Sequence, residues 1–155
     1  MNASVAAIVL AAGASRRLGQ PKQLLMLGGE TLLERAVRLV SEAGAAPVFV
    51  VLGAYHERIH EATPIGDAKI VINDRWKQGI ATSIHAALGG LDAAAPDAKG
   101  ALILSCDQPL LTAAHLRALI EIFAAQAEPS LVASAYAGVV GIPCDILRAD
   151  VLSAS

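Results

Sequence analysis

Short apolar runs recur along the chain, and few polar residues interrupt them. The clearest runs cover residues 5–10, 47–52, 69–72 and 100–106, and a further run covers 130–136. Their length and their content of β-branched residues are typical of strands that are covered on both faces of a sheet. The pattern therefore predicts a sheet whose strands are largely buried.

Apolar residues between these runs recur at helical spacing. Thr31 and Glu34 have the spacing of a capping box, and the helical pattern after them ends at Gly44, a residue typical of helix C-termini. Helices therefore separate most of the predicted strands. The other predicted helices cover residues 55–62, the stretch after 83 up to about 95, the stretch after Thr112 that ends before Pro129, and the chain from Asp145 onward.

This alternation predicts an α/β fold, with a mostly parallel central sheet between two layers of helices. Ligands of such sheets bind at the edge where the parallel strands end. The corresponding strand exits in this chain are residues 11–22, Gly53, 73–83 and 106–110. Binding and catalytic residues are expected in these segments.

Composition and charge narrow the class of protein. Of the 155 residues, 55% are hydrophobic and 17% are charged, as in a globular domain and unlike a disordered chain. The 12 Lys and Arg residues nearly balance 14 Asp and Glu, so no nucleic-acid partner is expected. No apolar stretch is long enough to span a membrane, and Cys106 and Cys144 are far apart in the sequence. We expect a cytoplasmic protein with reduced thiols and no membrane partner.

The segment 10–25 combines small residues with cations. Residues 11–13 carry almost no side chain, so their backbone N–H groups can approach a ligand closely. Arg16, Arg17 and Lys22 follow, and cations of this kind neutralise phosphate charge. The segment therefore predicts a polyanion site, although a surface turn with incidental basic residues is an alternative.

Two common phosphate loops do not match this segment. A Walker A loop needs four residues between its glycines and a Lys directly after the second, but Gly13 and Gly19 are farther apart and Lys22 follows Gln20 and Pro21. The Gly-x-Gly-x-x-Gly pattern of dinucleotide-binding folds is also absent.

The order of residues resembles the signature of the MobA-like NTP transferase family, Leu-Ala-Ala-Gly-x-Ser-x-Arg-x-Gly-x-Pro-Lys. This family includes the molybdenum-cofactor nucleotidylyltransferases. The resemblance implies a Rossmann-like α/β/α sandwich of the nucleotide-diphospho-sugar transferase type. The positions that match are Leu10, Ala11, Ala12, Gly13, Ser15, Arg17, Gly19, Pro21 and Lys22.

Three later segments extend the resemblance. Asn73, Trp76, Gly79 and Ser83 match a nucleotide-binding pattern, although glycine and hydroxyl residues are also ordinary helix caps. Asp107-Gln108-Pro109 matches the Asp-x-Pro of the family's metal ligand, although an Asp that starts a turn is also common. Residues 138–143 resemble a Gly-x-x-Gly-x-Pro segment that is expected to line the site of the second substrate.

The resemblance implies transfer of a nucleoside monophosphate from a nucleoside triphosphate to a phosphorylated small-molecule acceptor, with release of pyrophosphate. Lys22, Arg17 and Asp107 are the expected catalytic residues, and Asp107 is the expected ligand of Mg²⁺. Leu-Ala-Ala-Gly is similar to the cytidylyl-transferring branch, whereas the guanylyl branch has glycine where Ala12 stands. CTP and molybdopterin are the expected substrates. The residues implied in nucleotide binding are Leu10, Ala11, Ala12, Gly13, Ser15, Lys22, Asn73, Gly79 and Ser83.

We expect residues 1–155 to form a single nucleotidyltransferase domain that lacks a C-terminal Gly-Asp-x-Gly-Ala segment of the family. Because the Asp of that segment helps to hold the metal and the acceptor, a non-catalytic nucleotide-binding protein is an alternative. A sugar-phosphate or other small-phosphate nucleotidyltransferase is another. The sequence predicts no oligomeric state.

One rival motif points to different chemistry. His56 and His60 have the spacing of the H-E-x-x-H zinc motif, with both imidazoles on one face of a helix. The surrounding helix is short and polar and meets Pro64 within a turn, and no third ligand follows in a suitable position. Zinc hydrolysis is therefore the weakest of the alternatives, and exposed histidines on a solvated helix account for the motif.

Overall fold

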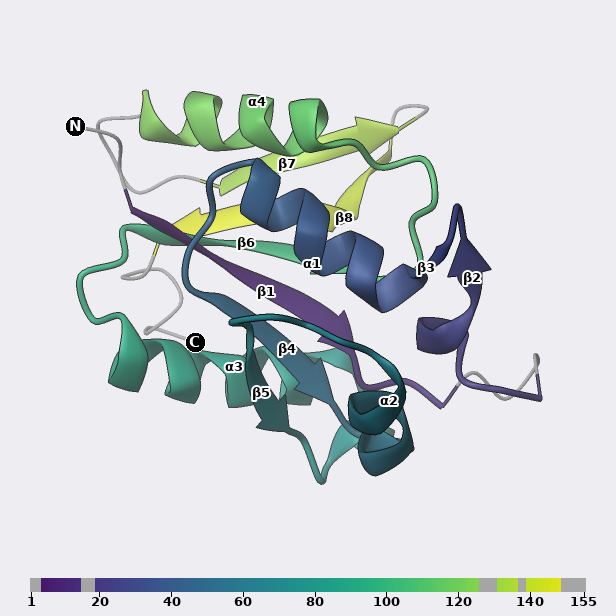
Figure 1. Cartoon of the computed structure of the whole chain (residues 1–155). Coiled ribbons are helices and arrows are strands. Elements are labelled where there is room, and N and C mark those ends of the chain that lie inside the picture. Colours follow the sequence, from purple (N-terminus) through teal and green to yellow (C-terminus); the bar gives the residue numbers. More distant parts are fainter. Residues whose placement is uncertain (1–3, 15–18, 126–130, 137–138, 149–155) are drawn as a thin grey trace.

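The computed structural model describes residues 4–14, 19–125, 131–136 and 139–148. They form a six-stranded sheet with helices on both faces, together with a small two-stranded hairpin (Figure 1). The order in the large sheet is β5-β4-β1-β6-β8-β7. Its strands are β1 (Val5–Ala11), β4 (Val48–Leu52), β5 (Lys69–Ile72), β6 (Gly100–Ser105), β7 (Leu131–Tyr136) and β8 (Val139–Arg148).

The sheet separates two apolar clusters. Alternate residues of β1 point to opposite faces, so Val9 belongs to one cluster and Ile8 to the other. Helices α1 (Leu32–Glu42) and α4 (Ala113–Ala124) cover the first face, and α3 (Ile80–Ala94) covers the second (Figure 1). A short helix, α2 (His56–Ala62), adds the buried Ile59 to the first cluster. The predicted three-layer α/β/α architecture is confirmed.

Parallel pairing brings the ends of four strands to one edge of the sheet. β1 pairs in parallel with both β4 and β6, and β4 pairs in parallel with β5. The register places Leu10 opposite Ser105, Ala11 opposite Leu52, and Leu52 opposite Ile72. The segments that follow these residues are therefore neighbours in space, as expected for a ligand site.

Local sequence signals explain where α1 begins and ends. The Thr31 hydroxyl accepts a hydrogen bond from the Glu34 N–H at 3.1 Å, and the Glu34 carboxylate accepts one from the Thr31 N–H at 2.6 Å. This reciprocal pair satisfies two backbone donors that the first turn leaves free. At the other end, Gly44 has φ +97°, a conformation that glycine adopts without a Cβ penalty. Both predicted ends are confirmed.

The hairpin that precedes α1 was not predicted from the apolar pattern. β2 (Met26–Leu27) pairs antiparallel with β3 (Glu30–Thr31) around Gly28 and Gly29. Both glycines have positive φ, at +62° and +87°, as a tight hairpin turn requires. Strands of two residues leave no periodic signal, so only the turn itself is visible in the sequence.

The helix expected from Asp145 onward is wrong for residues 145–148, which belong to β8. β8 pairs antiparallel with β6, with Asp145 opposite Ile103 and Arg148 opposite Gly100. Pairing with β8 satisfies the backbone groups along a side of β6 that would otherwise be an open sheet edge. This gain depends on a partner far away in the sequence, which a local pattern cannot show. The expected continuation of the helix beyond residue 148 lies outside the described residues.

None of the helices in the described part of the chain combines the length and the apolar character needed to cross a membrane.

Candidate nucleotide-binding site

A cavity lies at the edge where β1, β5 and β6 end. Its volume is about 220 Å³. Residues 10–13 form one wall, the start of α3 forms another, and Lys22 and Ser105 contribute polar groups between them. The lining residues are Leu10, Ala11, Ala12, Gly13, Lys22, Trp76, Gly79, Ile80, Ser83 and Ser105.

Most of the residues expected to bind nucleotide are therefore together. Leu10, residues 11–13 and Lys22 come from the first motif, and Gly79 and Ser83 come from the segment before and within α3. Their small side chains leave room for a ligand against the backbone. The structure thus brings residues 10–13 and the start of α3 to one cavity. In the sequence, the only sign that these segments lie close together was that each follows a predicted strand.

Lys22 and Asp107 form an ion pair at this cavity. Lys22 begins a short 3₁₀ helix, η1 (Lys22–Leu24), and its Nζ lies 2.8 Å from Oδ2 of Asp107. The Ser105 hydroxyl donates a hydrogen bond to the other oxygen, Oδ1. Partial burial alone would raise the pKa of the Asp107 carboxyl, but the hydrogen bonds from Lys22 and Ser105 lower it below its ordinary value. The carboxylate is therefore ionised at neutral pH. The two paired residues are 85 positions apart in the sequence.

Gln23 is a site residue that the motif comparison missed. Its side chain is fully buried, and its amide Nε2 donates to the carbonyl oxygens of Ala11 at 2.7 Å and Gly13 at 3.1 Å. These bonds fix the small-residue loop against η1 and so fix the loop relative to Lys22. The other amide atom, Oε1, is buried and has no hydrogen-bond partner among the described residues. The only sequence signal for this role of Gln23 was that it is polar and directly follows Lys22.

Trp76 forms part of the cavity wall because Gly53 leaves space for it. A Cβ added to Gly53 would lie 2.7 Å from Cβ of Trp76, closer than real Cβ contacts allow. Gly53 follows β4, and Trp76 begins the 3₁₀ helix η2 (Trp76–Gln78). The strand exit at Gly53 therefore supports the site through packing, and it does not line the cavity itself.

The structure gives Asn73 a supporting place. Asn73 is buried and is not among the residues that line the cavity. Its Nδ2 donates to the hydroxyls of Thr82 at 2.8 Å and Ser83 at 2.9 Å, and its Oδ1 accepts from the Arg75 N–H at 3.0 Å. These bonds hold the segment between β5 and α3 in shape, and that segment carries Gly79 and Ser83 to the cavity.

Several predicted positions lie outside the described residues. Ser15, Arg16 and Arg17 are among them, so the expected roles of Ser15 in nucleotide binding and of Arg17 in catalysis stay predictions. Gly138 is outside as well, and residues 139–143 are described only as backbone of β8. In the antiparallel register with β6, residues that precede Asp145 extend toward the end of β6 that leads to Asp107.

The carboxylate of Asp107 fits a metal shared with a nucleotide. Mg²⁺ and Mn²⁺ commonly take one or two carboxylates and complete their shells with phosphate oxygens and water. No group of three or more His, Cys, Asp or Glu side chains suited to a metal occurs in the described part of the chain. A zinc site at His56 and His60 thus gains no third ligand there, and α2 is only seven residues long.

Cys106 precedes Asp107 but is turned into the core. Its side chain is 3% exposed, and burial raises the pKa of the thiol to about 12, with the charge of Asp107 adding to the shift. A thiol in this state is a poor nucleophile at neutral pH because the thiolate is the reactive form. The charged pair described at this site is therefore the Lys22 ammonium and the Asp107 carboxylate.

Comparison with known families agrees with this arrangement. Residues 7–155 match the family described as "MobA-like NTP transferase domain". The chain belongs to this family. The resemblance seen in segment 10–25 is thereby confirmed, as is the nucleotidyltransferase type of fold.

Two curated proteins that are similar to this MobA-like chain carry different names. It is 39% identical over 114 residues to "Probable molybdenum cofactor guanylyltransferase" from Opitutus terrae, covering 73% of this chain and 53% of that protein. It is 37% identical over 109 residues to "Nicotine blue oxidoreductase" from Paenarthrobacter nicotinovorans, covering 70% of this chain and 52% of that protein. The chain thus spans about half the length of these curated relatives.

Solved structures share the whole fold of the MobA-like chain. Rv0371c from Mycobacterium tuberculosis superposes with a TM-score of 0.83 at 28% identity, covering 99% of this chain and 76% of that one. A complex of Rv0371c with manganese superposes with a TM-score of 0.77 at 26% identity, covering 99% and 75%.

Proposed function

We propose that this MobA-like chain transfers a nucleoside monophosphate from a nucleoside triphosphate to a phosphorylated acceptor. The observation that carries the proposal is the 2.8 Å contact between Lys22 Nζ and Asp107 Oδ2 beside a cavity walled by residues 10–13. A cation and a metal-binding carboxylate next to a backbone-lined cavity are the groups that phosphoryl chemistry needs. We further propose that residues 1–155 act as one domain in this reaction.

The reaction requires no general base. An oxygen of the acceptor phosphate is already anionic at neutral pH, so it can attack the α-phosphorus of the triphosphate directly. One P–O bond forms, the P–O bond to the β-phosphate breaks, and pyrophosphate leaves with the negative charge. Catalysis then depends on alignment and on charge stabilisation. In this scheme Lys22 stabilises the charge on the leaving pyrophosphate, and Arg17 is proposed to assist it.

Asp107 is the residue that would hold a divalent cation, and Mg²⁺ is the proposed ion. When bound, such a cation would neutralise phosphate charge during transfer. The manganese complex of Rv0371c supports a divalent metal without selecting Mg²⁺. In the present structure the Lys22 ammonium occupies one side of the Asp107 carboxylate. We propose that Lys22 leaves this carboxylate for the triphosphate when nucleotide and metal bind.

CTP is the proposed nucleotide and molybdopterin the proposed acceptor. Two observations at Ala12 support CTP. The cytidylyl branch resembles this chain at that position, and the methyl group of Ala12 narrows the cavity. The named guanylyltransferase relative instead favours GTP, which makes guanylyl transfer the second candidate. The segment 139–143, which extends toward the Asp107 end of β6, is the proposed side of the acceptor.

Pyrophosphate release tests the proposal. The chain is incubated with Mg²⁺, molybdopterin and either CTP or GTP, and nucleotide binding is measured in parallel by calorimetry. We expect release that requires the acceptor and is faster with CTP. Faster release with GTP would establish the second candidate. Nucleotide binding without release, in this chain and in a version extended to the length of its relatives, would instead indicate a non-catalytic nucleotide-binding protein.

Exchanging Ala12 for glycine tests the choice of base. Ala12→Gly removes a methyl group from the cavity wall, and one methyl-sized group in a pocket changes selectivity by about tenfold or more. We expect the ratio of kcat/KM for CTP over GTP to fall by about tenfold. Ala14→Gly is the matched control, because it adds a glycine to the same loop away from the cavity lining. An unchanged ratio in Ala12→Gly would remove this position from base selection.

A further inference from the structure

The segment that carries Asp107 is held from two sides. Before it, the Cys106 N–H donates to the Leu10 carbonyl at 3.3 Å, which ties the end of β6 to β1. After it, the Gln108 carbonyl accepts a hydrogen bond from Nη1 of Arg35 at 3.0 Å. Asp107 is therefore a single residue between two fixed backbone points. These two points fix the backbone from which its side chain projects, and the hydrogen bonds from Lys22 and Ser105 hold the carboxylate itself.

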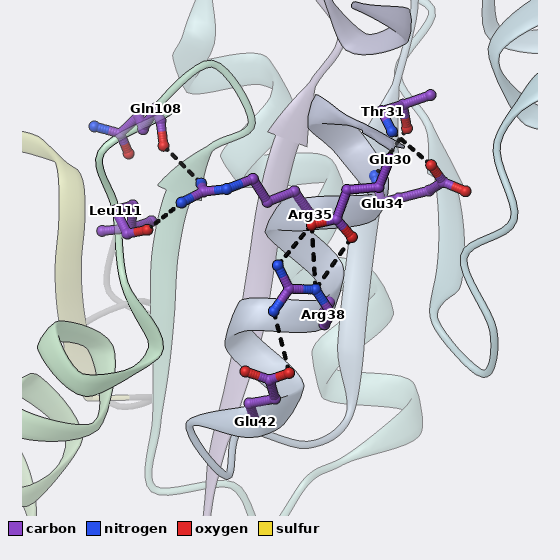
Figure 2. A network of polar contacts seen from close by, with 8 residues as sticks. All are labelled: Glu30, Thr31, Glu34, Arg35, Arg38, Glu42, Gln108 and Leu111. Atoms are coloured by element: carbon purple, nitrogen blue, oxygen red, sulfur yellow. Dashed lines mark hydrogen bonds and ion pairs between the residues drawn. The ribbon is translucent and has the colours of Figure 1, made fainter. Parts of the chain in front are cut away.

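Arg35 comes from α1 and reaches across to this segment. Its Nη2 also donates to the Leu111 carbonyl at 2.5 Å, so one guanidinium bridges two carbonyls of the same turn (Figure 2). The Leu111 N–H donates back to the Gln108 carbonyl at 3.2 Å, and the Leu111 side chain is buried. The guanidinium therefore contacts both ends of this hydrogen-bonded turn, and it links α1 to the segment that connects β6 with α4.

The bridge uses features that are specific to arginine. A guanidinium presents several N–H groups in a fixed plane, whereas a lysine ammonium is a compact point charge on a flexible stem. The fixed plane of the Arg35 guanidinium therefore holds the two carbonyls, three residues apart, in a fixed relation, whereas a lysine there would hold them less rigidly. The capping box at Thr31 and Glu34 lies directly before Arg35 and fixes the first turn of α1.

Arg38, one turn farther along α1, provides a natural comparison. It donates to the Glu30 carboxylate and, at 3.1 Å, to Glu42, and its side chain is 46% exposed. Figure 2 shows the Arg35 guanidinium directed toward Gln108 and Leu111, and that of Arg38 directed toward the two carboxylates. Two arginines on one helix therefore have separate partners, and only Arg35 contacts the Asp107 segment.

We propose that Arg35 is a positioning residue for the metal carboxylate: by bridging the carbonyls of Gln108 and Leu111, it sets the direction of the Asp107 side chain. The proposal rests on the proposed function, in which Asp107 holds a divalent cation. Arg35 touches neither substrate nor metal in this role. It acts through the backbone of the turn that follows Asp107. Groups outside the ligand set that orient a metal ligand affect metal affinity.

Manganese binding provides the test. Mn²⁺ affinity is measured by electron paramagnetic resonance, with a non-hydrolysable CTP analogue present, for the wild type and for Arg35→Gln, Arg35→Lys and Arg38→Gln. We expect both Arg35 variants to bind Mn²⁺ about tenfold more weakly, the lower end of the range for outer partners of metal ligands. Arg38→Gln should bind as the wild type does. Hydrogen exchange of residues 108–112 should accelerate in the Arg35 variants alone.

The outcomes separate positioning from mere stabilisation. A lowered Tm with unchanged Mn²⁺ affinity in Arg35→Gln and Arg35→Lys would overturn the proposal, as would wild-type exchange rates in the turn. Should Arg35→Gln fail to fold, Arg35→Lys alone decides, because it keeps the charge and the stem. Asp107→Asn serves as reference: unchanged Mn²⁺ affinity in that variant would exclude Asp107 as the metal ligand, and with it the part of the proposed function on which the role of Arg35 rests. Pyrophosphate release by the wild type tests the transfer reaction separately.

Discussion

Replacing Lys22 with alanine is expected to lower turnover about 10²–10³-fold, the range found when one preorganised group that stabilises transition-state charge is removed. The Lys22 ammonium lies at the cavity, within 2.8 Å of Asp107, and in the proposed reaction it meets the charge that develops on the leaving pyrophosphate. The effect should appear in kcat, measured by pyrophosphate release at saturating nucleotide.

Loss of folding does not account for so large an effect. The side chains of Lys22 and Asp107 are 32% and 40% exposed, and ion pairs of this kind contribute at most about 1 kcal/mol to stability. The Tm of Lys22→Ala should therefore stay close to that of the wild type. Lys99→Ala is the control, since Lys99 is exposed and directly precedes β6 at the opposite edge of the sheet. Wild-type turnover in Lys22→Ala would remove Lys22 from the catalytic site.

Asp107→Asn is expected to abolish the response to divalent metal together with activity, with a loss of about 10²-fold or more, since a bound cation contributes several kcal/mol of charge stabilisation. The amide keeps the size of the side chain, but it carries no charge. It also has one acceptor oxygen in place of two, so it accepts from only one of Lys22 and Ser105 in the present arrangement. Rates are measured across a range of Mg²⁺ and Mn²⁺ concentrations.

The control for Asp107→Asn is Asp97→Asn. Asp97 is exposed and lies before β6, away from the edge where the cavity is found. The Asp97→Asn variant should respond to divalent metal as the wild type does. A metal response in Asp107→Asn that matches both would exclude Asp107 as a ligand and would leave the source of any metal dependence elsewhere in the protein.

All strands of the large sheet except β8, and the ends of α1, were predictable because their signals are local. Buried strands such as residues 5–10 read as continuous apolar runs, and the Thr31 cap and Gly44 end are encoded within a few residues of each other. Because parallel strands end at one edge of the sheet, the sequence also predicts that residues 11–13 and Asp107 lie close together. Local encoding and one topological rule were sufficient for these features.

Two of the residues that hold segments of the site, Gln23 and Arg35, were not predictable. Gln23 bonds to carbonyls 10 and 12 residues away, and Arg35 bonds to carbonyls 73 and 76 residues away. Their partners are backbone atoms, which every residue possesses, so no pattern of side chains marks them. The prediction of a helix from Asp145 onward was wrong for a related reason. The strand conformation of Asp145 is decided by pairing with Ile103 in β6.

The packing of Trp76 against Gly53 gives the protein an optical property. The chain contains one tryptophan, and its ring lines the cavity with the Lys77 ammonium 5.5 Å from the ring centre. Tryptophan fluorescence of the whole molecule therefore originates at a single place, inside the candidate site. Emission intensity and wavelength should follow occupancy of the cavity without any attached label, so that binding can be observed separately from turnover.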